Sequence, residues 1–171
     1  HWMVLNEPLV FTGAGYFLGT HAPGKRGLKN FIPAVHHAVL CQNVGFLVVK
    51  LFLPDSIVGT TFSFSHIEPH NQKPSHKRAA HRVDALLNRL FLEPTLGLNY
   101  PKDGLAFLRY LEKHTVPGDL LEMDTPFDFI GVQVYTREVV RNSIAVPYLH
   151  ARLLKAQRRG QPHTSLGWEI H

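Results

Sequence analysis

Three short β-rich runs alternate with longer amphipathic segments along this chain of 171 residues. The runs cover residues 2–5, 57–64 and 127–134, and each has the β-branched or aromatic content of a buried strand. Between them, apolar residues recur at spacings of three and four, which predicts helices over 31–53, over 75–93 and from Pro101 onward. Strands that alternate with helices form parallel sheets covered by those helices. We therefore expect an α/β protein with about three parallel strands, organised as a single segment over residues 1–171.

Polar side chains occur at the C-terminal end of each expected strand. The first strand runs into Asn6-Glu7-Pro8, the second into Ser65-His66, and the third carries Gln133 and Tyr135. The loops beyond the C-terminal ends of parallel strands converge on one face, where α/β proteins place their chemistry. A lone glutamate before a proline is more often a simple loop residue, so Asn6-Glu7-Pro8 by itself does not establish a catalytic site.

Three other features carry weaker signals. Residues 12–24 are rich in glycine, which predicts a structured loop. The spacing of these glycines does not match a dinucleotide-binding fingerprint. Residues 137–167 are polar and basic with weak periodicity, and we expect one short helix near 149–156. Cys41 lies inside the long helical pattern, where we expect a small buried apolar group.

Charge and cysteine content argue against several classes of protein. The formal net charge of +5 comes from scattered Lys and Arg residues without an interleaved aromatic platform, so we expect no nucleic-acid partner. A membrane span needs about eighteen consecutive apolar residues, and no such run occurs. A single cysteine cannot form an internal disulfide, so the fold does not depend on an oxidising compartment and we expect a cytoplasmic location. The chain opens inside a strand pattern, and we expect it to be part of a longer protein.

The sequence favours neither a metal site nor a serine hydrolase. His66-x-Glu68-x-His70 offers potential ligands, but zinc sites usually have a defined spacing on helices or hairpins, with carboxylates behind the ligands. A nucleophile elbow of the form Gly-x-Ser-x-Gly does not occur. We therefore expect no metal and no cofactor.

Further motifs follow Asn6-Glu7-Pro8 in a fixed order. They are His21-Ala22-Pro23-Gly24, His36-His37, Arg82-Val83-Asp84, residues 88–94, Tyr100-Pro101, residues 128–132 with Tyr135-Thr136, and Gly167-Trp168-Glu169-Ile170. Together they closely resemble the successive landmarks of family 1 glycoside hydrolases, the β-glucosidase family, over practically the whole chain. The resemblance implies a partial (β/α)₈ TIM barrel, with about three parallel strands, the fourth to sixth, and their covering helices. A complete barrel needs roughly 250 residues.

The resemblance also implies roles for individual residues. Such enzymes hydrolyse β-glycosides with retention, using two glutamates whose carboxyl groups lie about 5 Å apart. By motif, Glu7 is the acid/base, Asn6 hydrogen-bonds the 2-hydroxyl of the sugar, and Tyr135 orients the nucleophile. Trp168 is similar to the indole platform on the aglycone side, and we expect His66 near it. The implied partner is a β-linked glucoside, a related oligosaccharide or an aryl glycoside.

Two positions depart from the family pattern. Gln133 replaces the usual asparagine before the paired tyrosines, and Val134 replaces the first tyrosine. Gln133 keeps an amide but reaches farther, so we still expect it to bind substrate.

The nucleophile motif of the family, similar to Ile-Thr-Glu-Asn-Gly, does not occur in the chain, so we expect residues 1–171 alone to be inactive. Glu68 is the best internal candidate for a second carboxylate, although the resemblance places it on a strand that does not carry the nucleophile. The alternative is a non-catalytic sugar-binding or structural fragment. Such a fragment would associate with complementary barrel segments or with itself, because its sheet edges and apolar interior would be uncovered.

Overall fold

The strands of this protein form one sheet. The computed structural model describes residues 1–119 and 123–171. Within them the sheet order is β1 (Trp2–Asn6), β2 (Val58–Pro69), β3 (Phe129–Asn142) and β4 (Ala151–Leu153). The first three strands pair in parallel, and β4 pairs antiparallel with β3. The three predicted strands are therefore present and neighbour one another in the predicted order.

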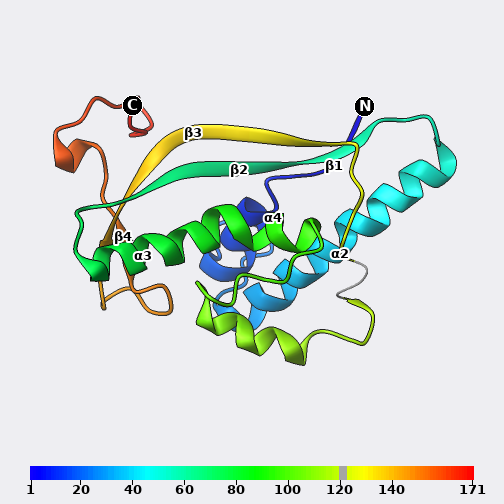
Figure 1. Ribbon diagram of the computed structural model, residues 1–171, viewed down its shortest axis with the longest axis horizontal. Coiled ribbons are helices and arrows are strands. Elements are labelled where there is room, and N and C mark those ends of the chain that lie inside the picture. Colours follow the sequence, from blue (N-terminus) through cyan, green and yellow to red (C-terminus); the bar gives the residue numbers. More distant parts are fainter. Residues whose placement is uncertain (120–122) are drawn as a thin grey trace.

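Helices cover one side of this sheet, as Figure 1 shows for α2, α3 and α4. The main core lies between these helices and β2, with Val35, Phe62, Leu90 and Leu108 among its most buried side chains. The helical elements in chain order are α1 (Pro8–Thr12), η1 (Gly13–Leu18), α2 (Leu28–Phe52), α3 (Pro74–Asp84), η2 (Ala85–Arg89), α4 (Leu90–Thr95), η3 (Ala106–Lys113) and η4 (Gln157–Arg159).

Helix α2 corresponds to the long helix expected over 31–53. By length and composition it is apolar enough to cross a membrane, with a mean hydropathy of 1.5 over its best window, of which 39% is buried. Its buried polar side chains nevertheless bond to other elements: His36 to Asp119 at 2.9 Å, and Gln42 to Thr60 at 2.6 Å. These bonds satisfy the polar groups inside the protein and favour a helix that packs on the sheet.

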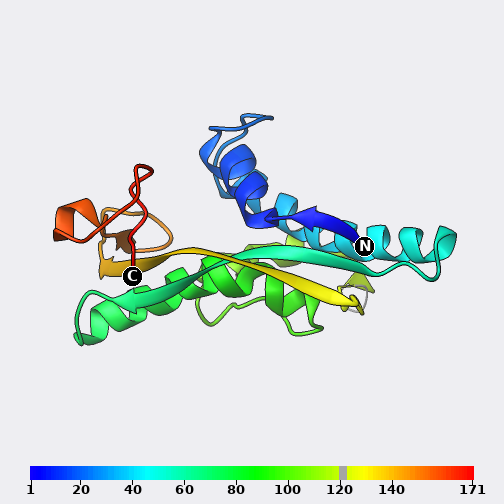
Figure 2. The same ribbon diagram turned by 90° about the horizontal axis from the view of Figure 1, so that it is seen from above.

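Two of the strands extend well past their expected ends. Pairing between β2 and β3 continues as far as Glu68 opposite Val139 and Pro69 opposite Val140. Figure 2 shows β2 and β3 running side by side far beyond the end of β1. His66 and Glu68 are consequently strand residues, and the prediction that they follow a strand end was wrong. The polar residues after Phe64 do not end the strand, because they lie on a partly exposed stretch of it.

The glycine-rich segment is helical, so the predicted loop over 12–24 was wrong for its first part. Pro8 starts α1, a position where its missing N–H costs nothing, and the Thr12 hydroxyl donates to the Pro8 carbonyl over 2.6 Å. The chain then continues through the π-helical turn η1. A Cβ atom on Gly15 would lie 2.5 Å from the Ala22 carbonyl oxygen, so this glycine permits close packing.

Two further expectations are corrected. The segment near 149–156 holds strand β4 and not a helix, because residues 151–153 bond to the edge of the extended β3. Cys41 is exposed and not buried, because it lies on a face of α2 that other described residues leave uncovered. Several apolar side chains of α2 are exposed as well: Val44, Leu47, Val48, Leu51 and Phe52.

Candidate active site

Asn6 and Glu7 lie where β1 turns into α1. Asn6 is the last residue of β1 and pairs with Thr61 of β2, and the Glu7 backbone N–H donates to the Thr61 carbonyl over 2.9 Å. Glu7 has φ 48° and ψ 60°, in the left-handed region that residues with a side chain rarely adopt. Backbone conformations of this kind cluster at functional sites. The chain thus reverses direction at Glu7, directly at the C-terminal end of a parallel strand.

A chain of hydrogen bonds connects β3 to Asn6 across the sheet. The Gln133 Nε2 group donates to Asn6 Oδ1 over 2.6 Å, and the Tyr135 hydroxyl donates to Gln133 Oε1 over 2.5 Å. Gln133 and Tyr135 share one face of β3 because side chains alternate along a strand. The structure therefore brings together three of the predicted site residues. It also orients the Asn6 amide, whose oxygen is occupied and whose Nδ2 group is left to donate.

Trp168 joins this group through Tyr135. The centroids of the two rings lie 5.1 Å apart with an interplanar angle of 39°. The backbone N–H of Glu169 donates to Thr136 Oγ1 over 2.9 Å, which fastens the C-terminal segment to β3 next to Tyr135. The predicted indole platform is thus adjacent to the predicted catalytic tyrosine.

Glu169 is a structural anchor of this segment. Its side chain is buried and accepts hydrogen bonds from both Arg137 and Arg159. These bonds, first that of Arg159 and then that of Arg137, lower the pKa of Glu169 to about 2. The carboxylate is therefore occupied by arginines, and Glu169 is not among the residues that line the cavity of Glu7 described next.

Glu7 lines a cavity of about 250 Å³ together with residues of α1, β2, η2 and α4. Phe62 and Phe91 form apolar parts of its wall, and Glu138 of β3 lines it as well. Burial raises the pKa of Glu138 above its ordinary value. The sequence prediction missed Glu138, because it ended the third strand at residue 134. The extended β3 carries this second carboxyl back to the same cavity as Glu7.

The structure does not bring Glu68 or His66 into this group. Glu68 accepts a hydrogen bond from Arg137 over 2.8 Å, so its charge is balanced by a neighbouring strand residue. His66 lines a separate pocket together with Ala80 and His81 of α3. His66 thus lies next to α3, and its proximity to Trp168 stays a prediction.

In the part of the chain that the structure describes, no group of three or more His, Cys, Asp or Glu side chains lies close enough to hold a metal ion. Histidines serve elsewhere: His36 bonds Tyr100 at 3.1 Å, and His81 bonds Asp103 at 2.8 Å. The site described above consists of a carboxyl, two amides, a phenol and an indole. Such a set binds and protonates a polar ligand with hydroxyl groups.

The sequence model of Glycosyl hydrolase family 1 matches residues 1–171. The chain belongs to this family. It is 30% identical to a 1,4-beta-D-glucan glucohydrolase of Thermotoga neapolitana, in a match that covers 99% of this chain and 39% of that protein. It is 29% identical to beta-glucosidase A of Thermotoga maritima, with 99% of this chain and 37% of that protein covered.

Solved structures of the family agree with this assignment. The family 1 β-glucosidase from Thermotoga maritima matches with a TM-score of 0.90 at 29% identity, over 100% of this chain and 38% of that one. That enzyme has also been solved in complex with isofagomine lactam. The sheet described here is accordingly part of the curled sheet of a family 1 barrel, and the chain spans less than two fifths of the length of these relatives.

Proposed function

We propose that the protein to which this chain belongs hydrolyses O-β-glucosides with retention, with Glu7 as the acid/base. The observation that carries the proposal is the hydrogen-bonded chain from Tyr135 through Gln133 to Asn6, directly next to Glu7 at the end of a parallel strand. Relatives of known activity in the family are β-glucosidases. A carboxyl at this place protonates the glycosidic oxygen as the bond breaks, and later takes a proton from the water that attacks the covalent intermediate.

The amides have distinct tasks in this proposal. Asn6 donates its free Nδ2 hydrogen to the 2-hydroxyl of the sugar, a contact that strengthens in an oxocarbenium-like transition state. Gln133 holds the Asn6 amide in the donating orientation by occupying its oxygen. Trp168 offers an apolar face to the aglycone beside Tyr135.

Tyr135 keeps the role that the family resemblance implies in this proposal, and orients the nucleophile. Its hydroxyl proton is directed to Gln133 Oε1, so a nucleophile that receives this proton has to compete with the Gln133 amide. Gln133 is longer than the asparagine usual at this position, and this extra length lets Oε1 accept the hydrogen bond from Tyr135. Gln133 is therefore a positioning residue for Asn6.

A retaining mechanism also needs a second carboxylate. We propose that further barrel strands supply it and that β1, β2 and β3 correspond to the fourth to sixth strands. Exposed apolar side chains support this arrangement, since Val132 and Val134 of β3 are 64% and 63% exposed and α2 carries the apolar face described above. Residues 1–171 by themselves would then behave as the non-catalytic alternative and associate with complementary segments or with themselves.

The test uses an aryl β-glucoside with a good leaving group and the complete protein. We expect Glu7→Ala to keep the glycosylation step, because such a leaving group needs little protonation, and to lose the second step. Added azide should restore turnover by attacking the intermediate without a base, and the β-glucosyl azide that forms identifies retention. If azide restored nothing, the assignment of Glu7 would be wrong. Residues 1–171 alone should give no turnover, and turnover that disappears with Glu7→Gln would show that the chain contains its own nucleophile.

A further inference from the structure

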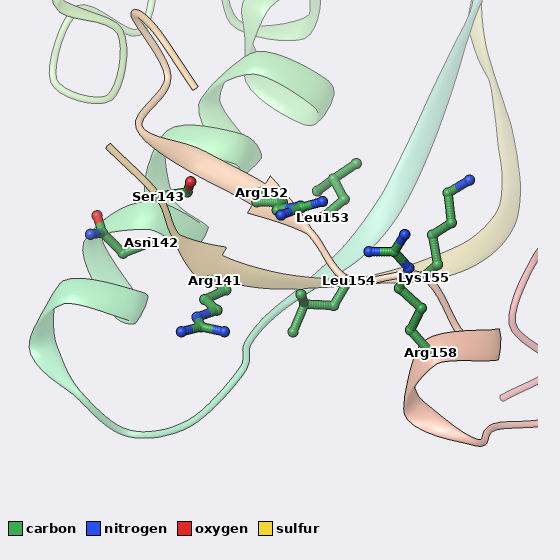
Figure 3. A pocket seen from close by; sticks show the side chains of 8 residues that line it. All are labelled: Arg141, Asn142, Ser143, Arg152, Leu153, Leu154, Lys155 and Arg158. Carbon is green, nitrogen blue, oxygen red and sulfur yellow. The ribbon is translucent and has the colours of Figure 1, made fainter. Parts of the chain in front are cut away.

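The hairpin formed by β3 and β4 carries a dense group of positive charges. Arg141, Arg152, Lys155 and Arg158 surround a cavity of about 640 Å³, together with the polar groups of Asn142 and Ser143 (Figure 3). Two leucines, Leu153 and Leu154, complete the lining. The lining contains no carboxylate. We call this place the hairpin cation site.

Two of these charges face each other across the hairpin. Arg141 of β3 is paired directly with Arg152 of β4 in the antiparallel register. Like charges directly opposite each other destabilise a strand pair. The chain therefore tolerates an unfavourable pair at a position where an acidic partner would stabilise the hairpin, and such local conflicts are expected at functional sites.

The four cations are also uncompensated within residues 1–119 and 123–171. None of the ion pairs that the described residues form includes Arg141, Arg152, Lys155 or Arg158. The neighbouring arginines behave differently, since Arg137 and Arg159 both bind Glu169. Glu169 is thus engaged by other arginines, and no ion pair among the described residues neutralises the hairpin cation site.

Helix α3 holds the hairpin in place. Arg82 of α3 donates to the carbonyls of Leu149, at 2.6 Å, and His150, at 2.9 Å, and also to Asn142 Oδ1 at 3.3 Å. Because the Asn142 oxygen is engaged by Arg82, its Nδ2 group is free to donate. The loop that joins the strands is therefore fixed before any ligand binds, which lowers the entropic cost of binding.

We propose that the hairpin cation site binds a ligand that carries two or more phosphate or sulfate groups. Arginine side chains match such groups with paired N–H donors, and four cations exceed what one group needs. The cavity volume is also that of pockets for organic ligands, which run from roughly 300 to 1,000 Å³. One phosphate ion would leave most of it empty.

The four cations of this site do not line the cavity of Glu7, although Leu153 lines both cavities. Arg141 lies six residues beyond Tyr135 on β3, about 20 Å along the strand at roughly 3.3 Å per residue. The proposal does not depend on glycoside hydrolysis, and its test needs no turnover.

Isothermal titration calorimetry of the complete protein with pyrophosphate and with sucrose octasulfate tests the proposal. We expect at least one of the two to bind, with an affinity that falls as salt is added. Arg141→Gln and Arg152→Gln should each weaken binding about tenfold, the loss expected for one charge-assisted hydrogen bond, and the double variant about a hundredfold. Arg109→Gln is the matched control, because it removes the same charge from an exposed position on η3.

The two probes distinguish the source of the anion. Binding of pyrophosphate alone indicates a phosphate ligand, binding of sucrose octasulfate alone a sulfated sugar, and binding of both a general polyanion site, and each result supports the proposal. Absence of binding to both probes overturns it, as does a double variant that binds like Arg109→Gln.

Two further readouts separate a binding site from a structural one. Arg152→Gln should leave the unfolding midpoint unchanged or raise it, because it removes a like-charge pair, and a lowered midpoint would assign Arg152 a structural role and count against the proposal. His76 accepts a hydrogen bond from the Asn142 backbone N–H at 3.2 Å, and burial together with His70, Arg141 and Lys73 lowers its pKa. A bound anion should raise that pKa in an NMR titration, and an unchanged value at saturating probe would place the probe elsewhere.

Discussion

The side-chain amide of Gln133 donates a hydrogen bond to the side-chain oxygen of Asn6, across the strand that separates them in the sheet. This contact fixes which end of the Asn6 amide is free. A hydroxyl group of a ligand that reaches Asn6 meets an N–H donor, and not a carbonyl oxygen.

The first prediction concerns this contact. Gln133→Ala should lower kcat/KM for an aryl β-glucoside about fivefold, because Asn6 loses the partner that orients it and one hydrogen bond of ~1 kcal/mol weakens in the transition state. With the corresponding 2-deoxy-glucoside the same substitution should have little effect. Steady-state kinetics with both substrates measures the difference.

Asn6→Ala provides the control for this pair. Because both residues act on the same hydroxyl group, the double variant Asn6→Ala with Gln133→Ala should be no worse than Asn6→Ala alone. An equal loss with the 2-deoxy substrate would contradict the assignment and would point to Tyr135, the other partner of Gln133.

The second prediction concerns the backbone at Glu7. Since φ is 48° there, a side chain is strained, and glycine removes that strain. Glu7→Gly should therefore unfold with a free energy about 1 kcal/mol higher than Glu7→Ala, in spite of the larger chain entropy of glycine. Both variants lack the carboxyl, so urea denaturation is the measurement. A glycine variant that is less stable than the alanine variant would show that Glu7 leaves this conformation in solution.

The third prediction concerns Glu138. Burial raises its pKa, so ionisation of Glu138 costs stability in the folded state once the pH exceeds the pKa of the unfolded chain. Glu138→Gln should consequently raise the free energy of unfolding at pH 7. The difference should vanish at low pH, where the carboxyl is protonated in both states.

Turnover gives an independent check on Glu138, which shares the cavity of Glu7. We expect Glu138→Gln to keep most of the activity of the complete protein. A loss as large as that of Glu7→Ala, together with failure to form the covalent intermediate, would make Glu138 the missing nucleophile.

The fourth prediction concerns Glu169, whose pKa of about 2 lies below that of the unfolded chain, about 4.5. A carboxyl with a lowered pKa stabilises the folded state above its unfolded pKa, and this contribution is lost as the pH falls from about 4.5 toward 2. The Glu169 amide, which bonds Thr136, should therefore lose hydrogen-exchange protection over that range. In Glu169→Gln the same amide should already be less protected at pH 7, with a free energy of opening lower by on the order of 2 kcal/mol.

Glu112→Gln is the matched control for Glu169. Its ion pair with Lys102 is exposed at the surface, and such pairs contribute roughly 0–1 kcal/mol. Equal behaviour of the two variants would mean that the arginines do not hold the C-terminal segment.

Much of the sheet could be predicted from sequence because its signals are local. The three runs of β-branched and aromatic residues mark β1, β2 and β3, and spacings of three and four mark α2 and α3. Asn6, Gln133, Tyr135 and Trp168 were singled out by their motifs, and the structure places them in contact.

The errors arise where a partner far along the chain decides the structure. Strand β4 exists because the edge of β3 extends to Asn142, and no local pattern announces such a partner. The same extension of the strands places Glu138 at the cavity of Glu7 and pairs Glu68 with Arg137. His66 lines a pocket with residues of α3, a neighbour that no local pattern in the sequence indicates.

The attachment of Trp168 has a kinetic consequence. Trp168 is 40% exposed, and the segment that carries it is held to β3 by Thr136 and by the arginines around Glu169. The sheet, in contrast, is held by a continuous apolar core. The two parts therefore open independently, and the segment opens first. If Trp168 binds the aglycone as proposed, opening of this segment frees the aglycone while the strands that hold Glu7 stay closed.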